Sequence, residues 1–269
     1  MSFTPSTILK PYVKEYFVVT IDKGVSNQVF FPSGYIDFAI NISNGRVITI
    51  INGRAVDMPR VEVLGHLTSP TRLTVADGTS VLIARIYPFA SSLFFPNPIS
   101  HFTNHSIDLR DVVGNESDDF YDRLIQSPSI GEKVRVLDTF LIQKLMKNEK
   151  MHRKTGIIKQ VCDDLSTDGE AFDIKELASR YGFSERYIQK LFIDIVGLAP
   201  RSLFSVQRFN KSLSQVLSSQ TDLTSIAYDC GYYDQAHFIR EFKKYTGITP
   251  SEARPLLSTN ESIQSVPSL

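Results

Sequence analysis

The first half of the chain alternates short apolar runs with pairs of turn-forming residues. Asn44-Gly45, Asn52-Gly53 and Asp77-Gly78 each separate two apolar runs. Such pairs favour tight hairpins because both residues accept a positive φ. Many short strands at this spacing are typical of an antiparallel sandwich or a small barrel. The predicted strands cover residues 16–21, 29–31, 35–42, 46–51, 61–67, 72–76 and 80–89, and a proline-broken loop is predicted at 94–104.

The pattern changes near residue 130, where apolar positions begin to recur with a helical period. Val134, Leu137, Leu141 and Leu145 lie three or four residues apart, which places them on one face of a helix. This face could form a seam between two copies of the chain or pack on the β-rich domain of its own chain. We favour the seam.

Residues 173–200 have the pattern of a helix-turn-helix. Asp173 is expected to cap the first helix, and Glu176 to complete a capping box. Gly182 fits the left-handed residue that ends a helix, and Ser184 is expected to cap the second. Two short helices joined by a tight glycine-containing turn define the motif. The predicted core residues are Ile174, Leu177, Ala178, Ile188, Leu191, Phe192 and Ile195.

The same pattern returns at residues 223–250, 49 or 50 residues further on. Gly231 takes the place of Gly182, and Asp234 begins a helix as Ser184 does. This is an internal duplication of one supersecondary unit, and not a solenoid. Between the copies, residues 200–217 are apolar at helical spacing.

The length of this connecting segment suits two units on one DNA molecule. Eighteen residues of helix span about 27 Å. Two recognition helices must lie about 34 Å apart to enter successive major grooves on one face of DNA. A single chain could therefore place both of its units.

Polar side chains fill the outer face of each second helix, which is the helix that enters the major groove. Arg and Lys favour O6 and N7 of guanine, and Gln favours N6 and N7 of adenine. The alternative for these side chains is a solvated helix surface. Because they recur in a duplicated frame, we predict that Arg186, Gln189 and Lys190, then Gln235, His237 and Arg240, contact DNA. Lys243 and Lys244 fit a phosphate contact or solvated surface equally well.

At about residues 157–256 the chain resembles the DNA-binding domain of the AraC/XylS family of bacterial transcription regulators. The most specific part is IAYDCGYYDQAHFIREFKKYTGITPSEAR at 226–254, and Arg208 matches a recurrent arginine of the family. Tyr232 stands where Phe is usual and supplies the same aromatic plug. The resemblance implies two helix-turn-helix units, base-facing sites at the six positions above, double-stranded DNA as ligand and RNA polymerase as a partner.

The first half resembles, more weakly, the β-rich N-terminal domains of one branch of that family, through residues 30–41, 64–70 and 84–95. In the family such a domain binds an effector, mediates dimerisation, or both. A small-molecule effector and a homodimer are therefore possible partners. The candidate ligand-lining residues are Phe31, Tyr35, Phe38 and Tyr87, although aromatic residues on strands more commonly fill a barrel.

Charge is balanced over the whole chain. The 269 residues include 29 basic and 29 acidic side chains, which argues against a globally basic coat but leaves room for a local binding face. From 173 to 254 there are eleven Lys or Arg and nine Asp or Glu, a net of plus two. We therefore expect modest non-specific DNA binding, with helix N-termini and backbone amides sharing the phosphate contacts.

Cysteine content and hydropathy indicate where the protein works. Two cysteines, Cys162 and Cys230, make no disulfide framework, suit a reducing compartment and fit core positions. The start of the chain lacks the pattern of a signal peptide, and no run approaches about 18 apolar residues. We expect a cytoplasmic protein with no membrane partner.

A metal-dependent enzyme with a cupin-like β domain and a helical accessory domain is the alternative. His101 and His105 are four residues apart, but their stretch is proline-rich and lacks an acidic or cysteine cluster. Metal bound through His66, His101 or His105 would support this alternative. No phosphate-binding loop or serine-elbow motif is present, so we expect no catalytic residues, no metal and no cofactor.

Together these patterns predict an α+β protein. A β-rich, barrel or cupin-like sensing domain covers residues 1–130, and a helix and linker with a possible role in dimerisation covers 131–154. An all-α DNA-binding domain with two helix-turn-helix motifs follows at 155–256, and a disordered tail at 257–269.

Overall fold

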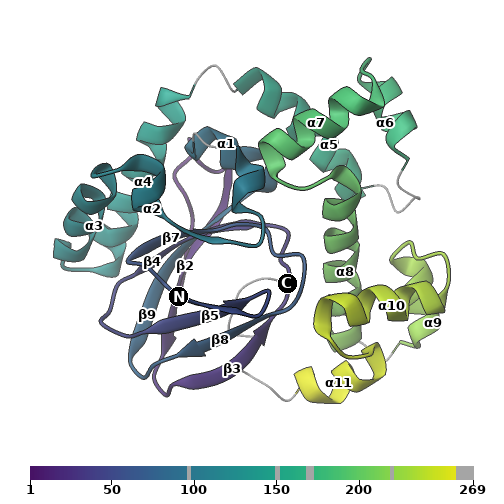
Figure 1. The fold of residues 1–269 in the computed structure, drawn as a ribbon, viewed down its shortest axis with the longest axis horizontal. Coiled ribbons are helices and arrows are strands. Elements are labelled where there is room, and N and C mark those ends of the chain that lie inside the picture. The colour runs from purple at the N-terminus through teal and green to yellow at the C-terminus, as the bar shows by residue number, and fades with distance from the viewer. Residues whose placement is uncertain (96–97, 149–151, 168–172, 219–220, 259–269) are drawn as a thin grey trace.

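The computed structural model describes all residues except 96–97, 149–151, 168–172, 219–220 and 259–269, so most of the predicted tail lies outside the described residues. Figure 1 shows a β-rich body on the left and a helical part on the right, with α8 standing between them. No described helix combines the length and the apolar character that crossing a membrane requires.

The strands are β1 (Ser2–Phe3), β2 (Val13–Ile21), β3 (Val25–Phe30), β4 (Ile36–Asn41), β5 (Val47–Ile51), β6 (Arg54–Asp57), β7 (Val61–Leu64), β8 (Thr71–Val75), β9 (Thr79–Ile86) and β10 (Ser106–Asp108). The helices are η1 (Pro88–Ala90), α1 (Ser91–Phe94), η2 (Ile99–Phe102), α2 (Leu109–Val113), α3 (Glu116–Gln126), α4 (Ile130–Lys147), α5 (His152–Thr167), α6 (Ile174–Arg180), α7 (Glu185–Val196), α8 (Pro200–Ser218), α9 (Leu223–Asp229), α10 (Gln235–Thr246) and α11 (Pro250–Ser258).

The strands form two antiparallel sheets. The six-stranded sheet has the order β1-β2-β9-β4-β7-β10, and the four-stranded sheet has the order β3-β8-β5-β6. Asn52 and Gly53 have φ values of 50° and 76° and make the two-residue turn between β5 and β6. This is the turn that an Asn-Gly pair favours. The predicted α+β fold, with a β-rich first domain and a helical second domain, is confirmed.

Helical structure begins earlier than the hydrophobic pattern predicted. The predicted strand at 80–89 ends at Ile86 because Pro88 starts the helical turn η1, where its missing N–H is not needed. The predicted loop at 94–104 contains the short helix η2, and α2 and α3 come before residue 130. The prediction missed α3 although Phe120 and Leu124, four residues apart, are both buried.

Helices cover one face of the six-stranded sheet. Phe38 of β4 points to this face, where its ring lies 6.0 Å from Phe120 of α3 and 5.9 Å from Phe140 of α4. The stripe of α4 that we favoured as a dimer seam is buried in the same core. That interpretation was therefore wrong, and the stripe packs on its own chain through Val134, Leu137, Leu141 and Leu145.

The other face of the same sheet carries a buried charged cluster. Arg85 of β9 donates to both carboxylate oxygens of Asp37 on β4, at 2.9 Å each, and is 2% exposed. Burial raises the pKa of Glu62 on β7 to about 7, although the Ser106 hydroxyl donates a hydrogen bond to its carboxylate. Burial also lowers the pKa of His66 to about 4, against the opposing influence of Asp37. A neutral Glu62 and a neutral His66 are thus the forms that this cluster favours.

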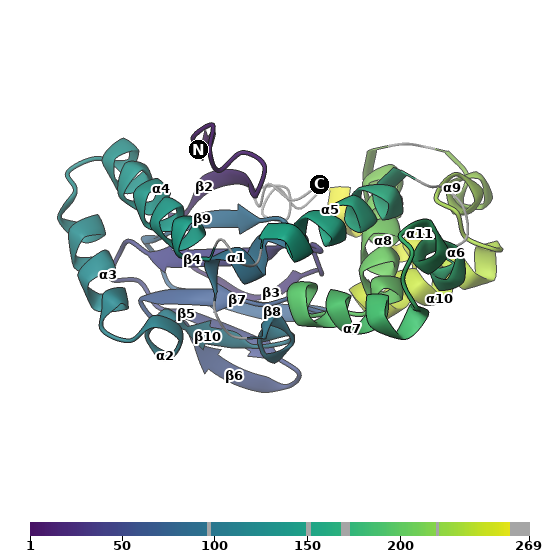
Figure 2. The ribbon, with the colours of Figure 1, turned by 90° about the horizontal axis from the view of Figure 1, so that it is seen from above.

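The β-rich domain and the first helix-turn-helix meet at the end of α7. Gly197, which follows α7, has a φ of 89° and lies against η2, where an added Cβ would come within 2.8 Å of the Ile99 carbonyl oxygen. The Thr103 hydroxyl donates to the Gly197 carbonyl at 2.7 Å. Behind this contact a single apolar core runs without a break from β4 to α7 and to the start of α8. Figure 2 shows the end of α7 reaching the β-rich body, whereas α10 lies farther away.

We predict that alanine is far more damaging at Gly197 than at the equivalent Gly247. Both residues have a left-handed φ, 89° and 82°, which costs an L-residue about 1–2 kcal/mol. Only at Gly197 does the new methyl group also meet backbone, because an added Cβ at Gly247 meets nothing within 4 Å. The Gly197→Ala change should therefore lower the free energy of unfolding in urea by at least ~1 kcal/mol more than Gly247→Ala. Equal losses in the two variants would contradict the close approach to Ile99.

We also predict that Glu62 makes the fold less stable as pH rises. Its carboxyl group has a pKa of about 7 in the folded protein, against an ordinary value of 4.5, so the folded state holds the proton more tightly. Its contribution is therefore present at low pH and is lost as pH rises from about 4.5 to 7, by roughly 3 kcal/mol. In Glu62→Gln this loss should vanish from the free energy of unfolding measured across that window. The exposed Glu185→Gln serves as the control, and an unchanged pH slope in Glu62→Gln would contradict the assignment.

Candidate nucleic-acid interface

The first helix-turn-helix has the caps that the sequence predicts. The Asp173 carboxylate accepts from the Lys175 amide at 2.7 Å, and the Ser184 hydroxyl accepts from the Tyr187 amide at 3.3 Å. Gly182 has a φ of 70°, as a left-handed residue that ends a helix should. Glu176 does not complete a capping box; it accepts from Arg180, one turn later, at 3.0 Å.

The second unit repeats this construction with one residue more. The Asp234 carboxylate accepts from the His237 amide at 2.6 Å, so Asp234 caps α10 as Ser184 caps α7. Before the turn the two units differ by 49 positions, from Gly182 to Gly231, and after it by 50. The additional residue is Tyr233, which is 86% exposed.

The exposed face of α7 carries the predicted side chains. Arg186, Gln189 and Lys190 are all exposed, and they lie within the first half of the helix. Ile193 continues the same face, seven residues after Arg186, and is 38% exposed. The buried face consists of Ile188, Leu191, Phe192, Ile195 and Val196. The exposed face of α7 therefore carries two basic side chains, one amide side chain and one apolar side chain.

The three side chains predicted to contact DNA from α10 lie at different positions around the helix. Counting 50 positions from α7, Ala236 corresponds to Arg186 and Arg240 to Lys190. Ala236 and Arg240 are both exposed, and Lys243 continues their face. Gln235 is exposed at the start of the helix, where its amide oxygen accepts from the Thr224 hydroxyl at 3.3 Å. His237 corresponds to Tyr187 and lies to one side of this face.

His237 is held by its own domain. Its side chain is 35% exposed, and its Nε2 lies 3.4 Å from Nη2 of Arg208 and 3.9 Å from the Glu241 carboxylate. Its ring meets the edge of Tyr232 at 5.3 Å between centroids. These contacts suit a residue that helps to hold α10 in place.

Arg208 connects α8 to α10 and to the turn before it. Its guanidinium donates to Glu241 at 3.0 and 2.7 Å, with both side chains about 90% buried. The same group lies 4.4 Å from the ring centroid of Tyr232 and donates to the Gly231 carbonyl at 3.4 Å. Two parallel hydrogen bonds fix the guanidinium plane, so one side chain sets the angle between α10 and α8. These contacts give a geometric role to the arginine that matches the recurrent arginine of the family.

The sequence interpretation missed Ala236, Ile193 and the alignment of Lys243 with Ile193. It selected side chains that can form hydrogen bonds with bases or phosphates, and alanine and isoleucine have no such group. The signal was present in the spacing, because counting from the caps Ser184 and Asp234 gives the equivalent positions directly. Apolar side chains also read DNA, through the methyl group of thymine.

The four candidate ligand-lining residues do not surround one site. Phe31 packs on α8, with its ring 6.3 Å from Phe209, and Phe38 lies in the helix-covered core. Tyr35 and Tyr87 do meet, at 5.9 Å between centroids, and Arg85 lies 5.6 Å from the Tyr35 ring. The structure therefore brings together only two of the four, at the edge of the charged cluster. Neighbouring residues of a strand point to opposite faces of the sheet. Phe38 therefore lies on the face away from Asp37 and from the charged cluster beside Tyr35.

The metal-enzyme alternative depends on His66, His101 and His105. Within the described part of the chain, no group of three or more His, Cys, Asp and Glu side chains is arranged to hold a metal ion. His66 is buried, and the Nδ1 atom of His105 is 2.9 Å from the Thr103 carbonyl. Cys162 and Cys230 are buried, and burial raises the pKa of both thiols, which keeps them protonated.

Two family models match the chain. One describes a helix-turn-helix domain and matches residues 177–255, which contain both units. The other describes a domain of unknown function (DUF6597) and matches residues 1–108, within the β-rich domain.

Known regulators match part of this chain. The virulence regulon transcriptional activator VirF of Yersinia enterocolitica is 25% identical over 32% of this chain and 31% of its own length. The arabinose operon regulatory protein of Escherichia coli is 26% identical over 45% of this chain and 43% of its own length. The chain thus spans less than half the length of these curated relatives. Among solved structures, ToxT from Vibrio cholerae is 16% identical, covers 88% of this chain with 97% of its own, and has a TM-score of 0.45. The duplicated unit, the helix-turn-helix match at residues 177–255 and the matching regulators together support the resemblance of the helical part to the AraC/XylS family of bacterial transcription regulators.

Proposed function

We propose that the protein is a sequence-specific DNA-binding transcription regulator that uses both helix-turn-helix units. The observation that carries this proposal is the repeated reading face. Two capped helices of equal length each present an exposed face, and on these faces the basic residues Lys190 of α7 and Arg240 of α10 stand at matching positions. The connecting helix α8 has 19 residues and spans about 28 Å, which suits neighbouring major grooves.

The exposed faces of α7 and α10 also indicate how DNA bases would be recognised. Arg186, Gln189 and Lys190 supply donors and an acceptor for base edges, and Ile193 and Ala236 supply apolar contacts for thymine methyl groups. His237 is a positioning residue in this scheme, since its ring is turned toward Arg208 and Tyr232. Phosphate contacts come from Lys243, Lys244 and the amides at the start of α7 and α10.

The β-rich domain is the regulatory part of this proposal. A signal bound there, or a partner such as a second copy of the chain, would shift the population of a DNA-competent arrangement. The continuous core between this domain and α7 supports such coupling. RNA polymerase is the further partner of a transcription regulator, and the cytoplasm is the compartment where such a protein meets the genome. No catalytic step, metal or cofactor enters the proposal.

A footprint on the DNA upstream of its own gene tests this function. The protein should protect a defined sequence above the non-specific background at moderate salt, with protection on one face over two successive major grooves. Uniform weak protection of every fragment would overturn the proposal.

Arg186→Ala distinguishes base reading from phosphate contact. If Arg186 reads a base, its loss should weaken binding to the protected sequence by about 1–3 kcal/mol and relax the preference at one base pair. Arg54→Ala, which removes an exposed arginine from β6, is the matched control and should leave the affinity unchanged. Equal weakening on all sequences in Arg186→Ala would mean that Arg186 meets only phosphate.

A further inference from the structure

The apolar interior of the protein is divided differently from its sequence domains. One core joins the β-rich domain to the first helix-turn-helix, and it includes Phe38, Ile99 and Phe192. The second helix-turn-helix has a separate core around Phe209, Phe238 and Phe242. Duplicated units are therefore in unequal settings: the first is part of the larger body, and the second packs mainly on itself.

The division between the two cores runs through α8. Leu203 and Phe204 belong to the first core, whereas Val206 and Phe209 belong to the second. A helix alone can bend or rock at such a division, because the apolar packing on either side is not continuous. Something must hold the second unit if α10 is to keep a fixed place relative to α7.

The loop between β3 and β4, residues 31–35, crosses this division. Phe31 packs against the second core, where its ring meets the Phe209 ring edge-on at 6.3 Å. The Asn210 side chain of α8 donates to the Ser33 carbonyl at 3.0 Å. Gly34, with a φ of 80°, lets the loop lie close to α8, where an added Cβ would be 3.4 Å from Val206.

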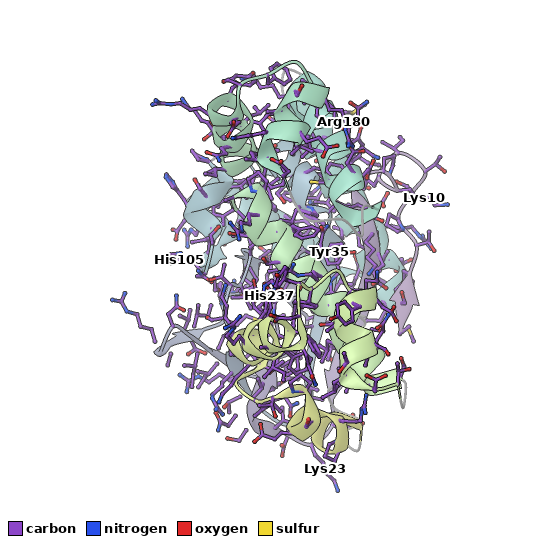
Figure 3. The ribbon with its side chains drawn as sticks, turned by 90° about the vertical axis from the view of Figure 1, so that its right-hand side faces the viewer. Lys10, Lys23, Tyr35, His105, Arg180 and His237 are labelled. Atoms are coloured by element: carbon purple, nitrogen blue, oxygen red, sulfur yellow. The ribbon has the colours of Figure 1, made fainter. Side chains whose placement is uncertain are left out.

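Both ends of this contact are anchored. On the side of the β-rich domain, the Tyr35 ring lies 4.7 Å from the Lys14 ammonium and 5.6 Å from the Arg85 guanidinium. On the other side, the Phe209 ring lies 5.6 Å from Phe242 and 4.9 Å from Tyr245, both on α10. Figure 3 looks onto the helical part, and its labels for Tyr35 and His237 both fall near the centre of that view.

We propose that the β3–β4 loop is a latch through which the β-rich domain positions the second helix-turn-helix. Phe31 and Asn210 are its positioning residues, and they act on α10 through Phe209. The first unit needs no latch because it shares the core of the β-rich domain. Any signal that displaced the loop would thus free α10 while leaving α7 in place. The importance of the latch for transcription rests on the proposed function, but its action on the structure does not.

Distances between paired spin labels test the latch on the full chain without DNA. One pair joins Arg54→Cys on β6 to Tyr233→Cys before α10, and the second joins Arg54→Cys to Glu185→Cys at the start of α7. All three positions are exposed. The buried Cys162 and Cys230 are replaced by alanine throughout, so that only the introduced thiols carry labels.

Phe31→Ala should broaden the distance distribution of the 54–233 pair and shift its mean, while the 54–185 pair stays as narrow as before. Asn210→Ala, a milder change, should do the same to a lesser degree, and Phe31→Tyr, which keeps the ring, should restore the narrow distribution. Val29→Ala, a matched truncation on the neighbouring strand β3, should change neither pair.

An unchanged 54–233 distribution in both Phe31→Ala and Asn210→Ala would overturn the latch. Equal broadening of both pairs would overturn it as well, because it would indicate general loosening. Since no DNA is present, a failed footprint would leave this result standing, and a failed latch would leave the footprint standing.

Discussion

The arrangement of this protein depends on a contact where only a residue without a side chain fits. Gly197 ends α7 in a left-handed conformation and lies against the carbonyl of Ile99, with Thr103 bonded to its own carbonyl. Because the backbones meet so closely, the first helix-turn-helix and the β-rich domain share one apolar core. The direction of the first recognition helix is therefore set by the β-rich domain and not by a flexible linker.

The second unit obtains its position by other means. Arg208 fixes α10 to α8 through its paired hydrogen bonds to Glu241, and these bonds act inside the unit. Contact with the β-rich domain passes through Phe31 and Asn210. Units that are duplicates in sequence thus differ in how firmly they are held, and weakly held elements are those from which proteins build switches. A signal at the β-rich domain could therefore displace α10 by moving the β3–β4 loop, whereas displacing α7 would require disrupting the shared core.

The sequence predicted the local structure of the helical part well because its signals are local. Caps such as Ser184 and Asp234 and the periodic core residues act within one turn of helix, so their pattern determines the units. The interpretation failed where a side chain has two possible neighbours. Phe38 could line a pocket or fill a core, and only the packing of distant segments decides. The same limit applies to Leu141, whose helical stripe fits its own domain as well as a second copy.

Native-state hydrogen exchange tests the division of the molecule into two unequal bodies most directly. The amides of Phe38 in β4 and Phe192 in α7 should exchange through one shared opening, with the same free energy and the same dependence on low urea. The amide of Phe242 in α10 should exchange through a separate opening of lower free energy. If Phe192 and Phe242 instead exchange together, and Phe38 exchanges apart from both, the two helix-turn-helix units form one body and this account is contradicted.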